Sequence, residues 1–327
     1  MPYWRLRWQE NLGRCKYFNR AGGPAQIMQK MALRVYFFLL FFWLGCAAIA
    51  SAQKIKNDFF TLHNIIRGDS TYNTFDKQVE LVKKAGFDGI EINQTQSFEG
   101  MKAALDKHQF AGSYFYVRVE LKEPYIDMRL EEYIQQLKGS KTIIAPFIIV
   151  DAARFKPSSH GADTLVVRLV TQLSDWAKAA GLQVAIYPHH GFYVERTNHA
   201  MLLIKQINRK NVGLTFNLCH WLATTSAAER TQLKPHLKEL KPYLKMITIC
   251  GANDVMTSQK TIWDDYILPL GTGSFDTYGL LKYVVKDLKF KGPIGIQCYN
   301  IKGNKPQLVQ NTMAIWKGYK SRLEYEQ

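Results

Sequence analysis

Short apolar runs alternate along this chain with longer segments in which apolar residues recur every three or four positions. Apolar runs of four to eight residues without polar alternation are typical of parallel strands that are buried on both faces. Eight such runs predict strands: Phe59–His63, Gly89–Ile92, Gly112–Val117, Thr142–Ile149, Val184–Tyr187, Val212–Phe216, Lys245–Ile249 and Pro293–Cys298.

The segments between these runs predict amphipathic helices. From Phe75 to Gly86, Val82 shares one face with Phe75, charged residues occupy the other face, and the closing glycine can cap the helix. The segment from Asp163 to Gly181 repeats this pattern with an acidic start and a glycine stop. Eight strand-then-helix units in about 270 residues predict a single closed (β/α)8 barrel, the TIM-barrel fold.

A doubly wound open sheet is the alternative fold. Such sheets usually have fewer strands and a glycine-rich phosphate-binding turn after the first strand. Here the first strand runs into His63–Ser70, which has no G-x-G-x-x-G pattern. No second domain is indicated, and the only long connection, from Cys250 to Tyr278, is a candidate lid or wall of an active site.

The first 52 residues do not follow the barrel pattern. Met31 offers a start, Arg34 a positive charge, Val35–Leu44 an apolar run, and Ala52 closes an A-x-A cleavage site, which together predict a secretory signal peptide over residues 31–52. A single membrane anchor is the alternative, but the apolar run is only about half the roughly 20 residues that a spanning helix needs. Residues 1–30 then read as an over-extended start, and residues 53–327 as the mature barrel domain.

The signal peptide predicts a periplasmic or secreted protein without a stable membrane span after cleavage. An alternative is a lipoprotein anchored through Cys46, although Trp43-Leu44-Gly45 matches the lipidation pattern poorly. Cleavage would leave three cysteines, Cys219, Cys250 and Cys298, all in or just after apolar runs. We expect buried thiols there rather than a disulfide framework.

The positive net charge could indicate a nucleic-acid partner, but its distribution along the chain argues against one. Residues 1–52 hold seven basic residues and one acidic residue, so their removal lowers the net charge from +16 to +10. No basic run and no stripe of alternating basic and aromatic residues accompanies that charge. An exported protein with scattered lysines is the expected class.

Polar side chains follow the predicted strands at their carboxyl ends, where barrel enzymes carry their active sites. In chain order they are His63, Glu91, Arg118 with Glu120, Asp151, His189 with His190, Asn217 with His220, Asn253 with Asp254, and Gln297. A structural role competes for some of them, because His63 could cap a loop and Asp151 a helix. Glu91 lies inside the apolar run GIEIN, where a carboxylate needs a partner or a function.

Five segments carry a resemblance to a known family. They are AGFDGIEI, YPHHG, NVGLTFNLCH, LGTGSFD and GPIGIQCY. In order and spacing, the chain from Phe59 to Trp316 resembles the xylose-isomerase-like superfamily of TIM barrels, which holds sugar isomerases, epimerases and inosose dehydratases. Pro188–Glu195 is similar to the H-P-H-x-G turn and following glutamate of inosose-dehydratase-like members.

The resemblance implies a divalent metal held by a glutamate, an aspartate, a histidine and a glutamate at strands five to eight. This sequence departs from that set, since strand five ends without the glutamate, Asn217 replaces the aspartate, strand seven lacks the histidine, and Gln297 replaces the last glutamate. Carboxylate charge is what chiefly holds hard cations. We therefore assign no metal ligands and leave the cofactor open. A divalent metal is possible, and a site built from His189, His190 and His220 could hold zinc or another transition metal.

The resemblance also implies a reaction class, which is proton transfer next to the carbonyl of a sugar by an isomerase, epimerase, dehydratase or hydratase. We expect His190 or Glu91 to act as general base and His220 to donate to the carbonyl oxygen. Asn217 and Gln297 are suited to hydrogen-bond sugar hydroxyls. Further side chains expected to contact the substrate are His63, His189, Glu195, Asp254 and Trp221.

Two other functions remain open. The loss of carboxylates is also what a non-catalytic sugar-binding barrel would show, with Tyr187, Phe192, Tyr193, Trp221 and Tyr299 as platforms for a sugar ring. A metal-dependent sugar isomerase with an altered ligand set is the other alternative. The apurinic endonucleases share this barrel, but their metal site needs more carboxylates and histidines than these strand ends offer. Export favours a sugar without a phosphate group, so the expected partner is a small carbohydrate.

Overall fold

The computed structural model describes residues 28–29, 54–257 and 261–326. The chain divides into two units, residues 1–52 and 53–327, and all strands of the described residues lie in the second. The predicted signal peptide, its cleavage site and Cys46 lie outside the described residues. None of the helices in the described ranges is long and apolar enough to cross a membrane.

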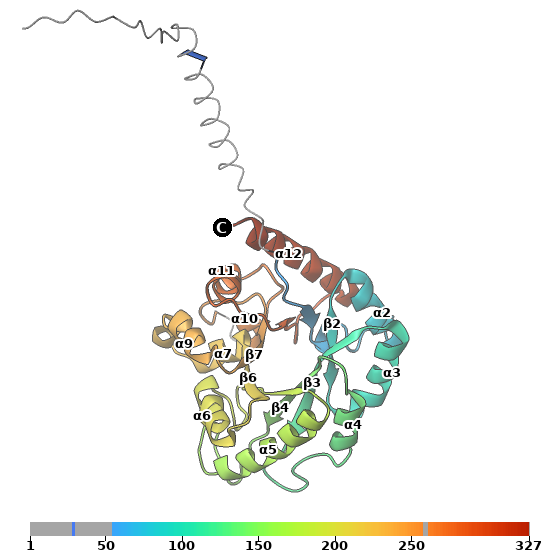
Figure 1. Cartoon of the computed structure of the whole chain (residues 1–327), viewed down its shortest axis with the longest axis vertical. Coiled ribbons are helices and arrows are strands. Elements are labelled where there is room, and N and C mark those ends of the chain that lie inside the picture. The colour runs from blue at the N-terminus through green and yellow to red at the C-terminus, as the bar shows by residue number, and fades with distance from the viewer. Residues whose placement is uncertain (1–27, 30–53, 258–260, 327) are drawn as a thin grey trace, which may run out of the picture. The chain divides into compact units, whose positions relative to one another are not determined.

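The strands form one closed barrel, in which each strand pairs in parallel with its neighbours in the sequence and β8 pairs with β1 (Figure 1). The strands are β1 Phe59–Thr61, β2 Gly89–Asn93, β3 Ala111–Val119, β4 Ile143–Ile148, β5 Gln183–Ile186, β6 Val212–Asn217, β7 Leu244–Ile249 and β8 Ile294–Ile296. The predicted fold and all eight predicted strands are confirmed, with strand ends shifted by at most two residues. β1 ends before His63 because that residue begins a 3-10 turn, its carbonyl accepting from the amides of Ile66 and Arg67.

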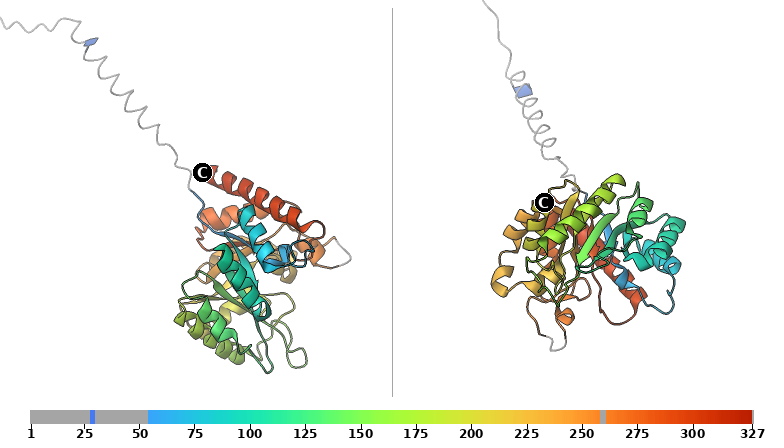
Figure 2. Two further views of the ribbon diagram at one scale, coloured as in Figure 1. Left: turned by 90° about the vertical axis from the view of Figure 1, so that its right-hand side faces the viewer. Right: turned by 90° about the horizontal axis from the view of Figure 1, so that it is seen from below.

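Helices surround the barrel, as the views in Figure 2 show. The α-helices are α2 Phe75–Ala85, α3 Phe98–His108, α4 Leu130–Gln136, α5 Asp163–Ala179, α6 Thr197–Ile207, α7 Leu218–Thr224, α8 Ala227–Arg230, α9 Leu233–Leu240, α10 Trp263–Tyr266, α11 Thr277–Lys282 and α12 Lys305–Tyr325. The shorter turns are 3-10 helices η1 His63–Ile65 and η2 Thr95–Ser97, and π-helix η3 Tyr283–Asp287.

Local sequence explains both ends of α2. Thr74 caps α2 by accepting a hydrogen bond from the amide of Lys77. Gly86 then ends the helix in the left-handed conformation, at a φ of 103°, which a side chain would disfavour. The predicted helix from Phe75 to its glycine cap is therefore confirmed.

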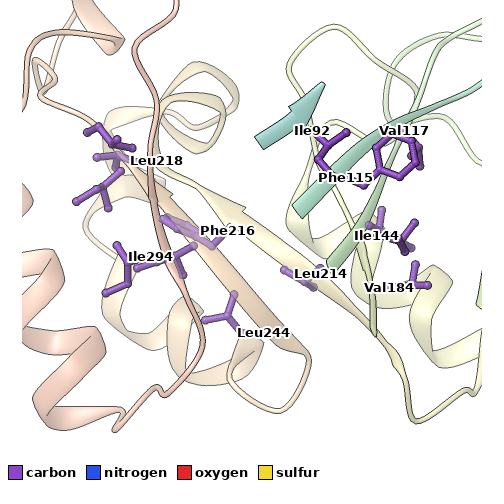
Figure 3. Packing of buried hydrophobic residues seen from close by; sticks show 14 of the residues in the cluster. Ile92, Phe115, Val117, Ile144, Val184, Leu214, Phe216, Leu218, Leu244 and Ile294 are labelled. Atoms are coloured by element: carbon purple, nitrogen blue, oxygen red, sulfur yellow. The ribbon is translucent and has the colours of Figure 1, made fainter. Parts of the chain in front are cut away.

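Two layers of apolar side chains result from the alternation along each strand. Phe115 and Val117 on β3 point outward into the layer between strands and helices, part of which Figure 3 shows. Tyr114 and Tyr116 on the same strand belong to the inner layer, with Phe147 and other side chains of the barrel interior. Fully burying one such side chain stabilises the fold by about 1.5–3 kcal/mol. The polar residues at the strand ends lie next to this inner aromatic layer.

The ends of the barrel domain meet on one side. α12 lies beside α2 (Figure 1), and Trp316 of α12 stacks on Phe59 of β1 with ring centroids 4.0 Å apart. Cys219, Cys250 and Cys298 are buried free thiols, as predicted.

Candidate functional site

A cavity of about 330 Å³ opens at the carboxyl ends of the strands. Its charged and imidazole side chains are Arg67, Glu91, Arg118, His189 and His220. Its amides are Asn64, Asn93, Gln94 and Gln297, and its aromatic side chains are Tyr114, Tyr116, Phe147, Tyr187, Phe192, Trp263 and Tyr299. Predicted residues from strands two, five, six and eight thus meet at one cavity.

Glu91 lies on the floor of this cavity, 2% exposed. One carboxylate oxygen accepts from the amide of His63 at 2.7 Å. The other accepts from the Tyr114 hydroxyl at 2.9 Å and from the Asn93 side chain at 3.1 Å. The carboxylate is therefore fixed in position by the turn η1 after β1, by β2 and by β3.

Burial raises the pKa of Glu91 above its ordinary value, and the three hydrogen bonds oppose that rise only in part. A carboxylate whose pKa is raised binds a proton more tightly than one in water. Glu91 is thus suited to accept a proton from a ligand and return it.

His189 lies in the turn after β5. Its Nδ1 donates to the carbonyl of His190 at 2.8 Å, and because a carbonyl only accepts, Nδ1 carries the proton. Burial lowers the pKa of His189 to about 4, so the ring is neutral at neutral pH. Its Nε2 then carries a lone pair and, within the described residues, makes no hydrogen bond. The ring stacks on Phe192 with centroids 3.9 Å apart.

His220, on α7, is 4% exposed, and neither ring nitrogen has a hydrogen-bond partner within residues 54–257 and 261–326. Its ring lies 3.9 Å from the ring of His189, centroid to centroid, and 5.3 Å from that of Trp263. Burial lowers the pKa of His220 well below the ordinary value, with the neighbouring histidines adding to the effect. A neutral imidazole with free nitrogens can donate to one ligand oxygen and accept from another group.

Gln297 follows β8. Its side-chain oxygen accepts from the Asn64 side chain and, at 3.0 Å, from the amide of Tyr299. Its Nε2 makes no hydrogen bond with the described residues, so this group remains able to donate to a ligand in the cavity it lines.

Asn217 is close to this cavity but does not line it. Its side-chain nitrogen donates to the carbonyl of Pro188 at 3.1 Å and to the hydroxyl of Thr215 at 2.9 Å, and its oxygen accepts from Thr248 at 2.9 Å. Three neighbours thus hold the side chain in place. Asn217 and His220 line a second cavity of about 180 Å³, so that His220 borders both cavities.

His190 and Glu195 lie outside the main cavity and beside each other. One oxygen of Glu195 lies 3.6 Å from Nδ1 of His190 and accepts from the amide of Gly191 at 2.9 Å. The other oxygen accepts from the Ser158 hydroxyl at 3.2 Å. Glu195 thus holds the turn that presents His189.

The remaining predicted site residues are spread more widely. His63 is buried, its Nε2 bonds the side chain of Gln78 at 2.7 Å, and burial lowers its pKa to about 4. Its backbone amide, rather than its ring, contacts Glu91. Asp254 is exposed and does not line the main cavity, and Trp221 lines the second cavity.

Several cavity residues escaped the sequence analysis. Asn64 and Arg67 follow β1, where only His63 drew attention, and Trp263 comes from α10 within the long connection. Tyr114 and Tyr116 sit at alternate inward positions of β3, a period-two signal that could have identified them. The sequence around Trp263 has no such signal. Its position confirms that the long connection from Cys250 to Tyr278 contributes to the wall of the cavity.

The metal site of related barrels is not supported by the side chains here. The amide oxygen of Asn217 is occupied by Thr248, and that of Gln297 by Asn64 and Tyr299. Hard cations are held chiefly by carboxylates. Among the described residues, Glu91 is the one carboxylate that lines the cavity with the two histidines, and both of its oxygens already accept hydrogen bonds. These side chains therefore do not fit a hard divalent cation at this position.

Comparison with known proteins places the chain in a family. The family described as xylose isomerase-like TIM barrel matches residues 79–319. The chain belongs to this family. No curated protein matches the sequence.

Solved structures with the same fold share little sequence with this member of the family. A D-allulose 3-epimerase from Methylomonas sp. is 14% identical, with a TM-score of 0.61 over 81% of this chain and 98% of its own. The 3-keto-D-glucoside 4-epimerase from E. coli is 16% identical, with a TM-score of 0.59 over 80% and 98%. The IOLI protein with a bound zinc atom is 17% identical, with a TM-score of 0.61 over 81% and 98%. At such identities the likeness concerns the fold.

Proposed function

We propose that this protein is an exported enzyme that moves a proton at the carbon next to the carbonyl of a sugar without a phosphate group. The reaction would be an isomerisation, an epimerisation, or the loss or addition of water. One observation carries the proposal: the fixed carboxylate of Glu91 and the free imidazole of His220 line the same cavity.

Each side chain has a distinct role in this reaction. Glu91, as a carboxylate, takes the proton from the carbon, because burial raises its pKa and so strengthens it as a base. His220, being neutral, donates a hydrogen bond to the carbonyl oxygen as negative charge develops there. His190, the other base considered from the sequence, lies outside the cavity lining, so Glu91 is preferred.

The names of two structural neighbours support this reaction class. One is a D-allulose 3-epimerase, and the other acts on a 3-keto-D-glucoside at position 4, which is the carbon next to the keto group. Both therefore suggest test substrates. The side-chain amides of Asn64, Asn93 and Gln297 also line the cavity, and amides can both donate hydrogen bonds to sugar hydroxyls and accept from them.

The test is exchange of the proton next to the carbonyl with deuterium from the solvent, followed by NMR on D-allulose and on a 3-keto-D-glucoside. Exchange does not require the final product to be known. We expect exchange with the wild type and a fall of roughly 10²–10⁴-fold in Glu91→Gln.

Glu99→Gln is the matched control, because Glu99 also accepts from a tyrosine hydroxyl, that of Tyr133 at 2.7 Å, but lies on α3 away from the cavity. Its exchange rate should equal that of the wild type. Undiminished exchange in Glu91→Gln would remove Glu91 from the proposed role.

A sugar-binding protein without catalysis is the second candidate, favoured by the aromatic side chains of Phe192, Trp263 and Tyr299 at the cavity. Calorimetry separates the two functions. Binding of a keto sugar without any exchange would support the binder, and binding with exchange the enzyme.

Export is part of the proposal and rests on residues 31–52. The amino-terminal sequence of the protein from its native host tests it. A mature chain that begins at Gln53 supports cleavage by signal peptidase, whereas a lipid-modified start at Cys46 would establish the lipoprotein instead.

A further inference from the structure

A cluster of metal-ligand side chains lies outside the candidate active site. His160 is in the loop before α5, Asp163 is the first residue of α5, and His199 is on α6. Nδ1 of His160 lies 2.8 Å from one oxygen of Asp163, and Nε2 of His199 lies 2.8 Å from the other. Within the described ranges, this is the only group of three or more such residues whose donor atoms all lie within 4.8 Å of one another.

We propose that His160, Asp163 and His199 form a zinc site. Two imidazole nitrogens and one carboxylate are a ligand set that Zn²⁺ takes in proteins, with water at the fourth position. None of the three residues lines the main cavity, so the site is separate from the proposed reaction.

A second layer of contacts already orients the carboxylate. The Tyr193 hydroxyl donates to Asp163 at 2.8 Å and accepts from the amide of Ala162 at 2.8 Å. Groups that hold metal ligands in this way are a regular part of metal sites. Tyr193 itself is buried, which makes the support rigid.

The histidines can accommodate the ion. Each must release a proton from the nitrogen that faces Asp163 and carry it on the other nitrogen. Nδ1 of His199 is buried and has no hydrogen-bond partner among the described residues, so no donor there prevents it from holding that proton. The side chain of His160 is 62% exposed, which gives the ion a path from solvent.

A second His–Asp cluster provides the contrast. Asp76 is 2.8 Å from Nε2 of His108 and 2.8 Å from the ammonium of Lys107. An ammonium has no lone pair and repels a cation, so this cluster should not bind metal. It differs from the zinc site chiefly in the third side chain.

The ion would fasten the loop between β4 and α5 to α6. Ser158, two residues before His160, donates to Glu195, which holds the turn that carries His189. Zinc would therefore stabilise a segment that supports the wall of the active site, without touching the substrate.

The test uses protein expressed from the full-length sequence, purified without a histidine tag and stripped with a chelator. Co²⁺ is added as a spectroscopic probe and Zn²⁺ as its competitor, with elemental analysis for stoichiometry. We expect one ion per chain, visible absorption bands of four-coordinate Co²⁺, and displacement by Zn²⁺. His160→Ala and Asp163→Asn should each weaken binding by at least about 100-fold.

His108→Ala and His220→Ala are the controls and should bind as tightly as the wild type. Because His160 is exposed, His160→Ala should fold, and its circular dichroism and urea midpoint without metal should match those of the stripped wild type. The proposal is overturned if the wild type binds no ion, if His160→Ala binds as tightly as the wild type, or if only His220→Ala loses the ion.

Discussion

Glu91 and His220 lie in the same cavity and are buried to the same degree, 2% and 4% exposed, yet their surroundings are opposite. The carboxylate accepts three hydrogen bonds, and the imidazole makes none within the described residues. A buried charge without partners is far more costly than a buried neutral ring. The difference indicates that the protein itself fixes the carboxylate of Glu91, whereas the ring nitrogens of His220 remain available to hydrogen-bond a ligand.

The largest expected effect tests the acidic side. Glu91→Ala leaves the amide of His63 and the hydroxyl of Tyr114 without a partner in the interior. We expect the free energy of unfolding to fall by roughly 4 kcal/mol, measured with urea. Glu99→Ala, which removes a carboxylate from an exposed helix position, should lower it by less than about 1 kcal/mol. Equal losses would mean that the contacts of Glu91 carry no special stability.

The histidine side predicts a loss of stability in acid. The pKa of His189 is about 4 in the folded protein and 6.5 in the unfolded chain, so the unfolded chain takes up the proton first as the pH falls. Its stabilising contribution is complete above pH 6.5 and is lost as the pH falls towards about 4. The loss amounts to about 3 kcal/mol.

His189→Gln cannot titrate, so its free energy of unfolding should fall about 3 kcal/mol less than that of the wild type over this range. His63→Gln should behave in the same way, because the pKa of His63 is also lowered to about 4 by burial. Urea unfolding at a series of pH values measures both. Parallel curves for variant and wild type would show that these rings do not remain neutral in the folded protein.

We expect a smaller change in the free energy of unfolding at Asn217 than at Glu91, and a smaller one still at its neighbour His220. Asn217→Leu strands the carbonyl of Pro188 and the hydroxyl of Thr248, and should lower the free energy of unfolding by about 2 kcal/mol. His220→Phe strands nothing and should change it by less than about 1 kcal/mol, while abolishing deuterium exchange. If His220→Phe were the more damaging to stability, its ring would have a partner in solution, such as a bound water.

The barrel could be predicted from the sequence because burial on both faces leaves a direct signal, an apolar run such as that of β4 or β6. The polar strand ends could also be identified, and Glu91, His189, His220 and Gln297 do meet at one cavity. Glu91 was identifiable because a carboxylate in an apolar run needs a reason to be there.

What could not be predicted depends on rotamers and loops. Asn217 and Gln297 are both amides at strand ends. Thr248 and Pro188 hold the first, whereas Nε2 of the second makes no hydrogen bond with the residues that the structure describes. Nothing in the sequence distinguishes the two. Trp263 reaches the cavity from a connection whose path is set by tertiary contacts rather than by a local pattern.

The smallest expected effect concerns Glu120, which follows β3 and pairs with Arg118 at 2.7 Å. Both side chains are partly open to solvent, so the pair gains little from its attraction and loses side-chain freedom. Glu120→Gln should therefore change the free energy of unfolding by less than about 0.5 kcal/mol, and added salt should reduce even that difference. Urea unfolding at low and high salt checks both points. Glu91 lies on β2 and Glu120 directly after the neighbouring β3, so a loss from Glu120→Gln as large as that from Glu91→Ala would show that burial does not set the difference between them.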